Sequence, residues 1–146
     1  MVGYMLTWTT YGTWLQGDKR GYVKDGQILG ENQALHEANK NAQKSKAVRL
    51  SEESWHIIKD AILKEAKEIG QRIHAISICS NHVHIVAGCV EEAVGKVAGR
   101  YKKAATDALR ENGFGGKVWT KGFDKRFCLD EKELKQRINY VQNHNK

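Results

Sequence analysis

Long apolar runs, paired cysteines and proline are all lacking from this sequence of 146 residues. No apolar stretch approaches the ~20 residues that a helix needs to span a bilayer, so no membrane span is expected. The start of the chain lacks the basic region and cleavage site of a secretory signal. The three cysteines, Cys79, Cys89 and Cys128, suggest no disulfide framework and lack zinc-knuckle spacing. We therefore expect reduced thiols and a cytoplasmic location, and the absence of proline excludes no fold class by itself.

Positive charge is in excess, because 24 Lys and Arg residues stand against 17 Asp and Glu residues, a formal net charge of +7. The bases concentrate between residues 96 and 126, where acidic residues are few. Such an excess attracts polyanions, most commonly nucleic acid. A solvated basic surface with no such partner is the alternative, and charge alone does not exclude it.

The length suits one compact domain, residues 1–146, with a hydrophobic core of its own. β-Forming side chains predict an opening strand over residues 3–10. Residues 21–29 predict a small hairpin around an Asp-Gly turn. The polar stretch 31–46 is either a surface loop or an exposed helix.

The rest of the chain alternates between helical and strand patterns. The expected elements are a helix that Ser51 caps and that runs to about Ile69 before Gly70, strands at 73–79 and 82–89 joined by Ser80-Asn81, a helix at 92–111, a strand at 126–129 and a helix at 131–144 that Asp130 caps. This order predicts an α+β fold of ferredoxin-like character, in which helices cover an antiparallel sheet of four to five strands.

Two histidines share one face of a predicted strand. Residues two apart in a strand point the same way, so His82 and His84 project together while Val83 and Ile85 face the core. Two neutral imidazoles in this arrangement can bind one divalent ion. Two surface or hydrogen-bonded histidines without a metal are the more frequent alternative.

The last predicted helix carries Tyr140 and His144, which are one turn apart on one face. Leu134, Ile138 and Val141 face elsewhere, so Tyr140 need not be a core aromatic. A half-buried tyrosine with its hydroxyl in water is the alternative explanation.

Together these motifs resemble the HUH superfamily, most closely its single-tyrosine transposases, which include the smallest insertion-sequence transposases and the REP-associated tyrosine transposases. The strand 80–86 is similar to the family's Asn-His-x-His-hydrophobic strand. Residues 119–126, 130–134 and 140–144 are similar to its run of tryptophan, glycine-phenylalanine, basic strand, acidic helix start and catalytic tyrosine. The resemblance implies the HUH fold, which is a ferredoxin-like or RRM-like sheet.

The resemblance also implies a reaction. His82 and His84 would bind Mg²⁺ or Mn²⁺, which would polarise a scissile phosphate. Tyr140 would attack that phosphate, forming a 5′-phosphotyrosine link and freeing a 3′-hydroxyl. The family's third ligand is usually Gln or Asn one turn after the tyrosine; here that position is His144, with Asn143 as the fallback ligand. The implied partner is single-stranded or hairpin DNA, and Tyr140 would serve its own chain or a partner in a homodimer.

DNA contacts are expected from basic and aromatic side chains. The expected phosphate contacts are Lys96, Arg100, Lys102, Lys103, Lys121, Lys125 and Arg126. The aromatic residues that could stack on unpaired bases are Trp8, Tyr11, Trp14 and Trp119, although a core position is favoured for Trp8.

Other functions remain open at this point. An RRM-like module would hold nucleic acid without cutting it, and a domesticated transposase would retain nicking alone. A two-histidine phosphodiesterase needs two His-x-Ser/Thr motifs, which the sequence lacks. A replication initiator of the same superfamily usually adds a helicase segment, for which the chain has no room.

Overall fold

The computed structural model describes residues 1–12 and 48–144. The elements in chain order are β1 (Gly3–Thr9), α3 (Glu52–Ile69), β2 (Ile73–Ile78), β3 (His82–Gly88), α4 (Val94–Glu111), β4 (Asp124–Cys128) and α5 (Glu131–Gln142). The predicted hairpin at 21–29, the polar stretch 31–46 and Trp14 lie outside the described residues.

The described strands form one sheet in the order β2-β3-β1-β4, and every neighbouring pair is antiparallel. The two central strands, β1 and β3, are joined through α3 and β2, and α4 leads on to the edge strand β4. This is the β-α-β-β-α-β arrangement of ferredoxin-like folds, to which α5 is added. The predicted α+β class and antiparallel sheet of four to five strands are confirmed, with four strands among the described residues.

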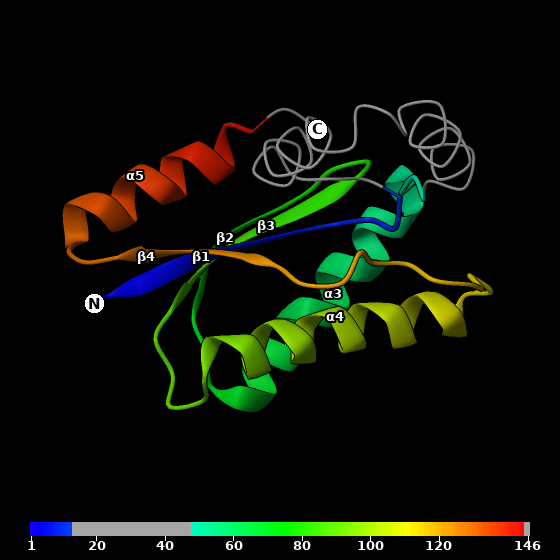
Figure 1. Ribbon diagram of the computed structural model, residues 1–146, viewed down its shortest axis with the longest axis horizontal. Helices are drawn as coiled ribbons and strands as arrows, with labels where there is room; N and C mark the ends of the chain where they lie inside the picture. The colour runs from blue at the N-terminus through cyan, green and yellow to red at the C-terminus, as the bar shows by residue number, and fades with distance from the viewer. Residues whose placement is uncertain (13–47, 145–146) are drawn as a thin grey trace, which may run out of the picture.

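Helices cover both faces of the sheet (Figure 1): α3 and α4 lie on one face, and α5 lies on the other. Alternation along the strands divides the core in the same way. Tyr4, Leu6 and Trp8 of β1 belong to the larger cluster, with residues of α3 and α4. Met5 of β1 packs with Val86, Leu134 and Val141 in the smaller cluster beneath α5. β1 is therefore buried along its whole length.

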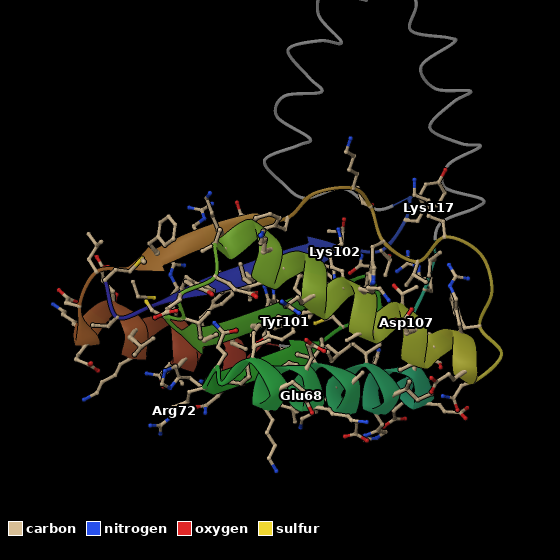
Figure 2. All side chains as sticks on the ribbon, turned by 90° about the horizontal axis from the view of Figure 1, so that it is seen from below. Glu68, Arg72, Tyr101, Lys102, Asp107 and Lys117 are labelled. Atoms are coloured by element: carbon tan, nitrogen blue, oxygen red, sulfur yellow. The ribbon has the colours of Figure 1, made fainter. Side chains whose placement is uncertain are left out.

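A buried polar network joins α4 to the sheet. The hydroxyl of Tyr101, labelled in Figure 2, donates to Oε1 of Gln71. Nε2 of Gln71 donates to the hydroxyl of Tyr4 and to the carbonyl of Gly88, both at 2.7 Å. Burial raises the pKa values of both phenols, so both stay protonated, with Tyr101 as a donor and Tyr4 as an acceptor toward Gln71. The network therefore links α4 through Gln71 to the central strands β1 and β3.

The predicted caps are confirmed. Ser51 Oγ accepts from Ser54 N at the start of α3, and Gly70 ends that helix in the left-handed region with φ of 70°. Asp130 accepts from Glu133 N at the start of α5.

Three predicted boundaries are wrong by two residues. α4 begins at Val94 instead of residue 92, because Glu92 precedes the first turn and its carboxylate instead accepts from Arg100 at 2.6 Å. β4 covers 124–128 instead of 126–129, because Asp124 pairs with Thr7 and extends the ladder. α5 ends at Gln142, two residues before the predicted end at His144.

Within residues 1–12 and 48–144, every helix is too short or too polar to cross a lipid bilayer.

Candidate active site

The paired histidines lie on the sheet face that α5 covers. Strand register places His84 between Thr7 of β1 and Ser77 of β2. His82 lies opposite Thr9 on one side, and on the other side its carbonyl accepts from Cys79 N at 2.8 Å. Side chains at directly opposite positions share a face. The polar side chains of three strands are therefore collected around the two imidazoles.

Helix α5 brings Tyr140 and His144 to the same place. Leu134 and Val141 anchor this helix in the smaller core cluster, on the face that also carries Val86. The ring centroid of Tyr140 lies 5.6 Å from that of His84 and 5.4 Å from that of His144. The Tyr140 side chain is 48% exposed. Tyr140 is thus beside the histidines of its own chain and accessible to a large substrate.

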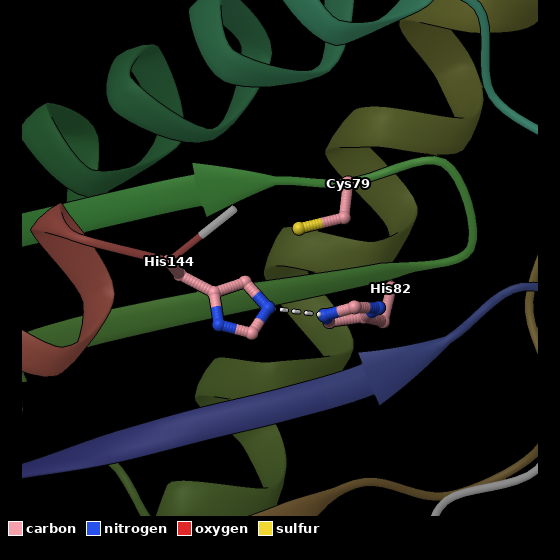
Figure 3. A group of neighbouring side chains, drawn as sticks. All are labelled: Cys79, His82 and His144. Carbon is pink, nitrogen blue, oxygen red and sulfur yellow. Dashed lines mark hydrogen bonds between the residues drawn. The ribbon is translucent and has the colours of Figure 1, made fainter. Parts of the chain in front are cut away.

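The three imidazoles are in mutual contact. Nε2 of His82 and Nε2 of His144 are 2.9 Å apart, as the dashed line in Figure 3 shows. The ring of His84 has its centroid 4.7 Å from that of His82 and 4.6 Å from that of His144. Sequence periodicity predicted the two pairs separately, and the fold joins them into one cluster.

Hydrogen bonds orient the imidazoles. Nδ1 of His82 is 2.7 Å from Oδ1 of Asn81. Because an amide oxygen only accepts, Nδ1–H donates and Nε2 carries the lone pair. Nδ1 of His84 shares a hydrogen bond of 2.8 Å with the hydroxyl of Thr7.

Both strand histidines are held neutral. Burial, followed by the charge of His144, lowers the pKa of His82. Burial lowers the pKa of His84 to about 3, and His82 and His144 add to this effect. Neutral imidazole is the form that binds metal ions, so both rings are competent ligands at neutral pH.

The converging donors differ in one member from the predicted ligand set. Among the described residues, Cys79, His82 and His144 form a group whose ligand atoms all lie within 4.8 Å of one another (Figure 3). His84 is not in this group, and Asn143, the fallback ligand, donates its side-chain amide to the carbonyl of Asn139. The sequence prediction missed Cys79. A signal existed, because a two-residue turn at Ser80-Asn81 places Cys79 opposite His82.

Solved structures share this arrangement of elements. A REP-associated tyrosine transposase bound to a REP hairpin aligns with a TM-score of 0.60 and 13% identity, over 96% of this chain and 64% of that chain. A protein from Deinococcus radiodurans, provisionally assigned as a transposase, aligns with a TM-score of 0.54 and 16% identity, over 97% of this chain and 88% of that chain. The chain therefore shares the fold of these two proteins. It spans less than two thirds of the first neighbour's length. No protein-family model and no curated protein sequence matches the chain.

The predicted basic contacts on α4 lie across the sheet from the histidines, because α4 and α5 cover opposite faces (Figure 1). Arg100 pairs with Glu92 and Glu65, and Lys103 pairs with Asp107. Lys102, labelled in Figure 2, donates to two carbonyls of the 120–122 segment at 2.9 Å. Burial lowers the pKa of Lys102. These side chains stabilise the helical layer, and Lys96 is exposed on the same helix.

The other predicted basic contacts lie on β4 and in the loop before it, and the two on β4 point to opposite faces of the sheet. Arg126 is opposite Met5 and therefore shares the histidines' face, where it pairs with Asp124 at 3.2 Å. Lys125 points to the other face, with Nζ 5.7 Å from the ring centroid of Phe127. Lys121 is exposed in the preceding loop. Among the predicted DNA contacts on β4, Arg126 is therefore the one whose side chain lies on the same face of the sheet as the histidines.

Two of the aromatic residues considered for base stacking are in the core. Trp8 is fully buried and meets Trp119 edge to face, with ring centroids 5.9 Å apart. Nε1 of Trp119 donates to the carbonyl of Lys102. The core position favoured for Trp8 is confirmed, and Trp119 is likewise a packing residue. Tyr11 is partly exposed, with Nζ of Lys117 4.9 Å from its ring centroid.

Proposed function

We propose that this chain cleaves and rejoins single-stranded DNA through a covalent bond to Tyr140, as in DNA transposition. The observation that carries the proposal is the exposed phenol of Tyr140 beside three clustered imidazoles of the same chain. The transposase fold of the structural neighbours supports it.

Tyr140 supplies the nucleophile. Its phenolic oxygen attacks the phosphorus and the bond from phosphorus to the departing 3′-oxygen breaks. The phenolic proton passes to solvent, and the departing 3′-oxygen takes up a proton from solvent. The products are a 5′-phosphotyrosine and a free 3′-hydroxyl. Because one phosphoester replaces another, the reverse attack by a 3′-hydroxyl rejoins the strand without an external energy source. The half-exposed position of Tyr140 leaves room for a DNA backbone over the cluster.

The imidazole cluster fits a divalent metal ion. His82 and His144 would hold it, since their Nε2 atoms already approach to 2.9 Å and Asn81 fixes the tautomer of His82. When bound, the ion would polarise the scissile phosphate and offset the charge that develops on it. Of Mg²⁺ and Mn²⁺, this nitrogen-rich site favours Mn²⁺. His84 is hydrogen-bonded to Thr7 and lines the cluster beneath Tyr140.

Single-stranded DNA with a hairpin is the proposed substrate. One structural neighbour is a transposase bound to a REP hairpin. In this chain the net charge of +7 and the exposed side chains of Lys121 and Arg126 suit phosphate contacts.

Incubation with a labelled pool of single-stranded hairpins, with Mn²⁺ or with EDTA, tests the reaction. We expect a protein–DNA band that survives denaturation, disappears with EDTA and is absent from Tyr140→Phe. Tyr11→Phe is the matched control and should retain the band. Tight binding without a covalent product would indicate a nucleic-acid-holding module instead. Cleavage products without a covalent band would indicate a hydrolytic phosphoesterase.

A further inference from the structure

Cys79 points into the imidazole cluster from the strand next to the histidines. It directly follows β2, and its N–H donates to the carbonyl of His82 at 2.8 Å. The hairpin therefore holds these two residues side by side on one face of the sheet. The Cys79 side chain is directed toward His82 and His144 (Figure 3), although the residue is only 2% exposed. Packing alone does not call for a thiol beside two ring nitrogens.

Hydrogen bonds around Cys79 and His82 orient their ligand atoms for binding a cation. Asn81 holds the proton of His82 on Nδ1, so the Nε2 lone pair faces Nε2 of His144. A ligating histidine commonly donates its other N–H to such an oxygen. Ser77 Oγ lies 3.7 Å from Cys79 Sγ and can donate to a thiolate. The cluster thus has an oriented ligand and a hydrogen-bond donor for the sulfur.

We infer that Cys79, His82 and His144 form a Zn²⁺ site with one thiolate ligand, two imidazole ligands and a fourth position open to solvent or substrate. The three ligand atoms lie within 4.8 Å of one another, which small side-chain movements can close around one ion. Sulfur and nitrogen donors without a carboxylate select Zn²⁺ or Co²⁺ over Mg²⁺ and Mn²⁺.

Binding has a defined proton balance. Cys79 binds as the thiolate, so its Sγ–H proton passes to solvent as the metal–sulfur bond forms. In the metal-free cluster Nε2–H of His144 donates to Nε2 of His82, so His144 must move its ring proton to Nδ1 before its Nε2 binds the ion. The site shares His82 and His144 with the proposed function, so Zn²⁺ competes with the ion that supports DNA cleavage. Zn²⁺ binding itself requires neither Tyr140 nor DNA.

Titration of the metal-free protein with Co²⁺ tests the ligand set, because thiolate bonded to Co²⁺ gives a charge-transfer band in the near ultraviolet. We expect this band in the native chain and in Tyr140→Phe. Cys79→Ser should lose it and bind Zn²⁺ at least about tenfold more weakly. Cys89→Ser is the matched control, since Cys89 is exposed and outside the group, and it should retain both properties.

X-ray absorption of the native chain loaded with one Zn²⁺ gives an answer even if Cys79→Ser fails to fold. We expect one sulfur at about 2.3 Å and nitrogens at about 2.0–2.1 Å. Zn²⁺ bound by nitrogen and oxygen alone, or bound no more tightly than Mn²⁺, would overturn the inference. If the native chain shows the sulfur ligand but forms no covalent DNA adduct, the proposed function is refuted and the Zn²⁺ site stands.

Discussion

His84 is the buried member of the imidazole cluster, with 6% of its surface exposed. The ring lies against His82, His144 and Tyr140, and Thr7 holds its Nδ1. Protonation in the folded state would place a charge among groups that offer no carboxylate partner within this ring cluster. His84 therefore supports the site as a neutral imidazole, and it lowers the free energy of unfolding when the pH falls.

We predict that acid destabilises the fold through His84. Its folded pKa is about 3, below the usual value of 6.5, so the unfolded chain binds more protons between these values. The contribution of neutral His84 to the free energy of unfolding is therefore fully present above about pH 6.5 and is lost progressively as the pH falls toward 3. His84→Asn, which retains a polar group facing Thr7, should reduce the loss between pH 7 and pH 4 by roughly 1–2 kcal/mol. Urea unfolding at both pH values checks this, and an unchanged difference would contradict it.

The positions of single site residues could be predicted from the sequence where the local periodicity of a strand or helix determines which way the side chain points. Strand alternation placed His82 and His84 on one face, and helical spacing placed Tyr140 one turn from His144. Cys79 was missed because its alignment with His82 depends on pairing across the turn. The contact between His82 and His144 joins residues 62 positions apart, which no local pattern determines.

Helix α5 is the element that turns a histidine-bearing sheet into a candidate active site. It covers the face opposite α3 and α4, and Leu134 and Val141 hold it there with Met5 and Val86. Its N-terminus is also fixed, because Glu133 accepts from Leu129 N and Asp130 accepts from Glu133 N. Tyr140 is placed by this anchoring, nearly three turns beyond the cap residue Asp130.

Leu134→Ala should loosen α5. Leu134 is buried, and its truncation should lower the free energy of unfolding by about 2–4 kcal/mol. Covalent DNA adduct should form several-fold more slowly even where the variant remains folded, because Tyr140 loses its support. Leu129→Ala is the control, since Leu129 is 68% exposed and should change both quantities little. Equal adduct rates in the two folded variants would show that α5 packing does not position Tyr140.

The ends of helices and strands could be predicted from the sequence where a capping residue marks them, and they were misplaced where no capping residue does. Ser51, Gly70 and Asp130 mark helix ends through local hydrogen bonds and backbone angles. The start of α4 has no side-chain cap, and the start of β4 is set by pairing with β1. Both were misplaced for that reason.

The whole molecule separates its charges across the sheet. The α4 bases lie on the side away from the imidazole cluster, where carboxylates pair with Arg100 and Lys103. Arg126 lies on the strand face that the cluster shares. Composition predicted a nucleic-acid partner from the total charge, but the strand order β2-β3-β1-β4 decides which charges adjoin the site. That order arises from long-range pairing, so sequence periodicity indicated the fold class without placing the basic residues.

Arg126→Gln should weaken hairpin binding more than Lys103→Gln. Because the Arg126 guanidinium would neutralise one DNA phosphate, its replacement should reduce the slope of log affinity against log salt by about 1. Lys103 faces away from the site and pairs with Asp107, so its removal should leave the slope nearly unchanged. Binding titrations of both variants at several salt concentrations provide the comparison. A larger effect at Lys103 would place DNA on the α4 side.

The identity of the residue bonded to DNA tests the central claim most directly. After reaction with a hairpin in Mn²⁺ and nuclease trimming, trypsin should release residues 138–146, a peptide whose only tyrosine is Tyr140. Mass spectrometry should find a nucleotide on this peptide, with fragment ions that assign it to Tyr140. A nucleotide on any other residue, or a cleaved hairpin with no modified peptide, would contradict the account.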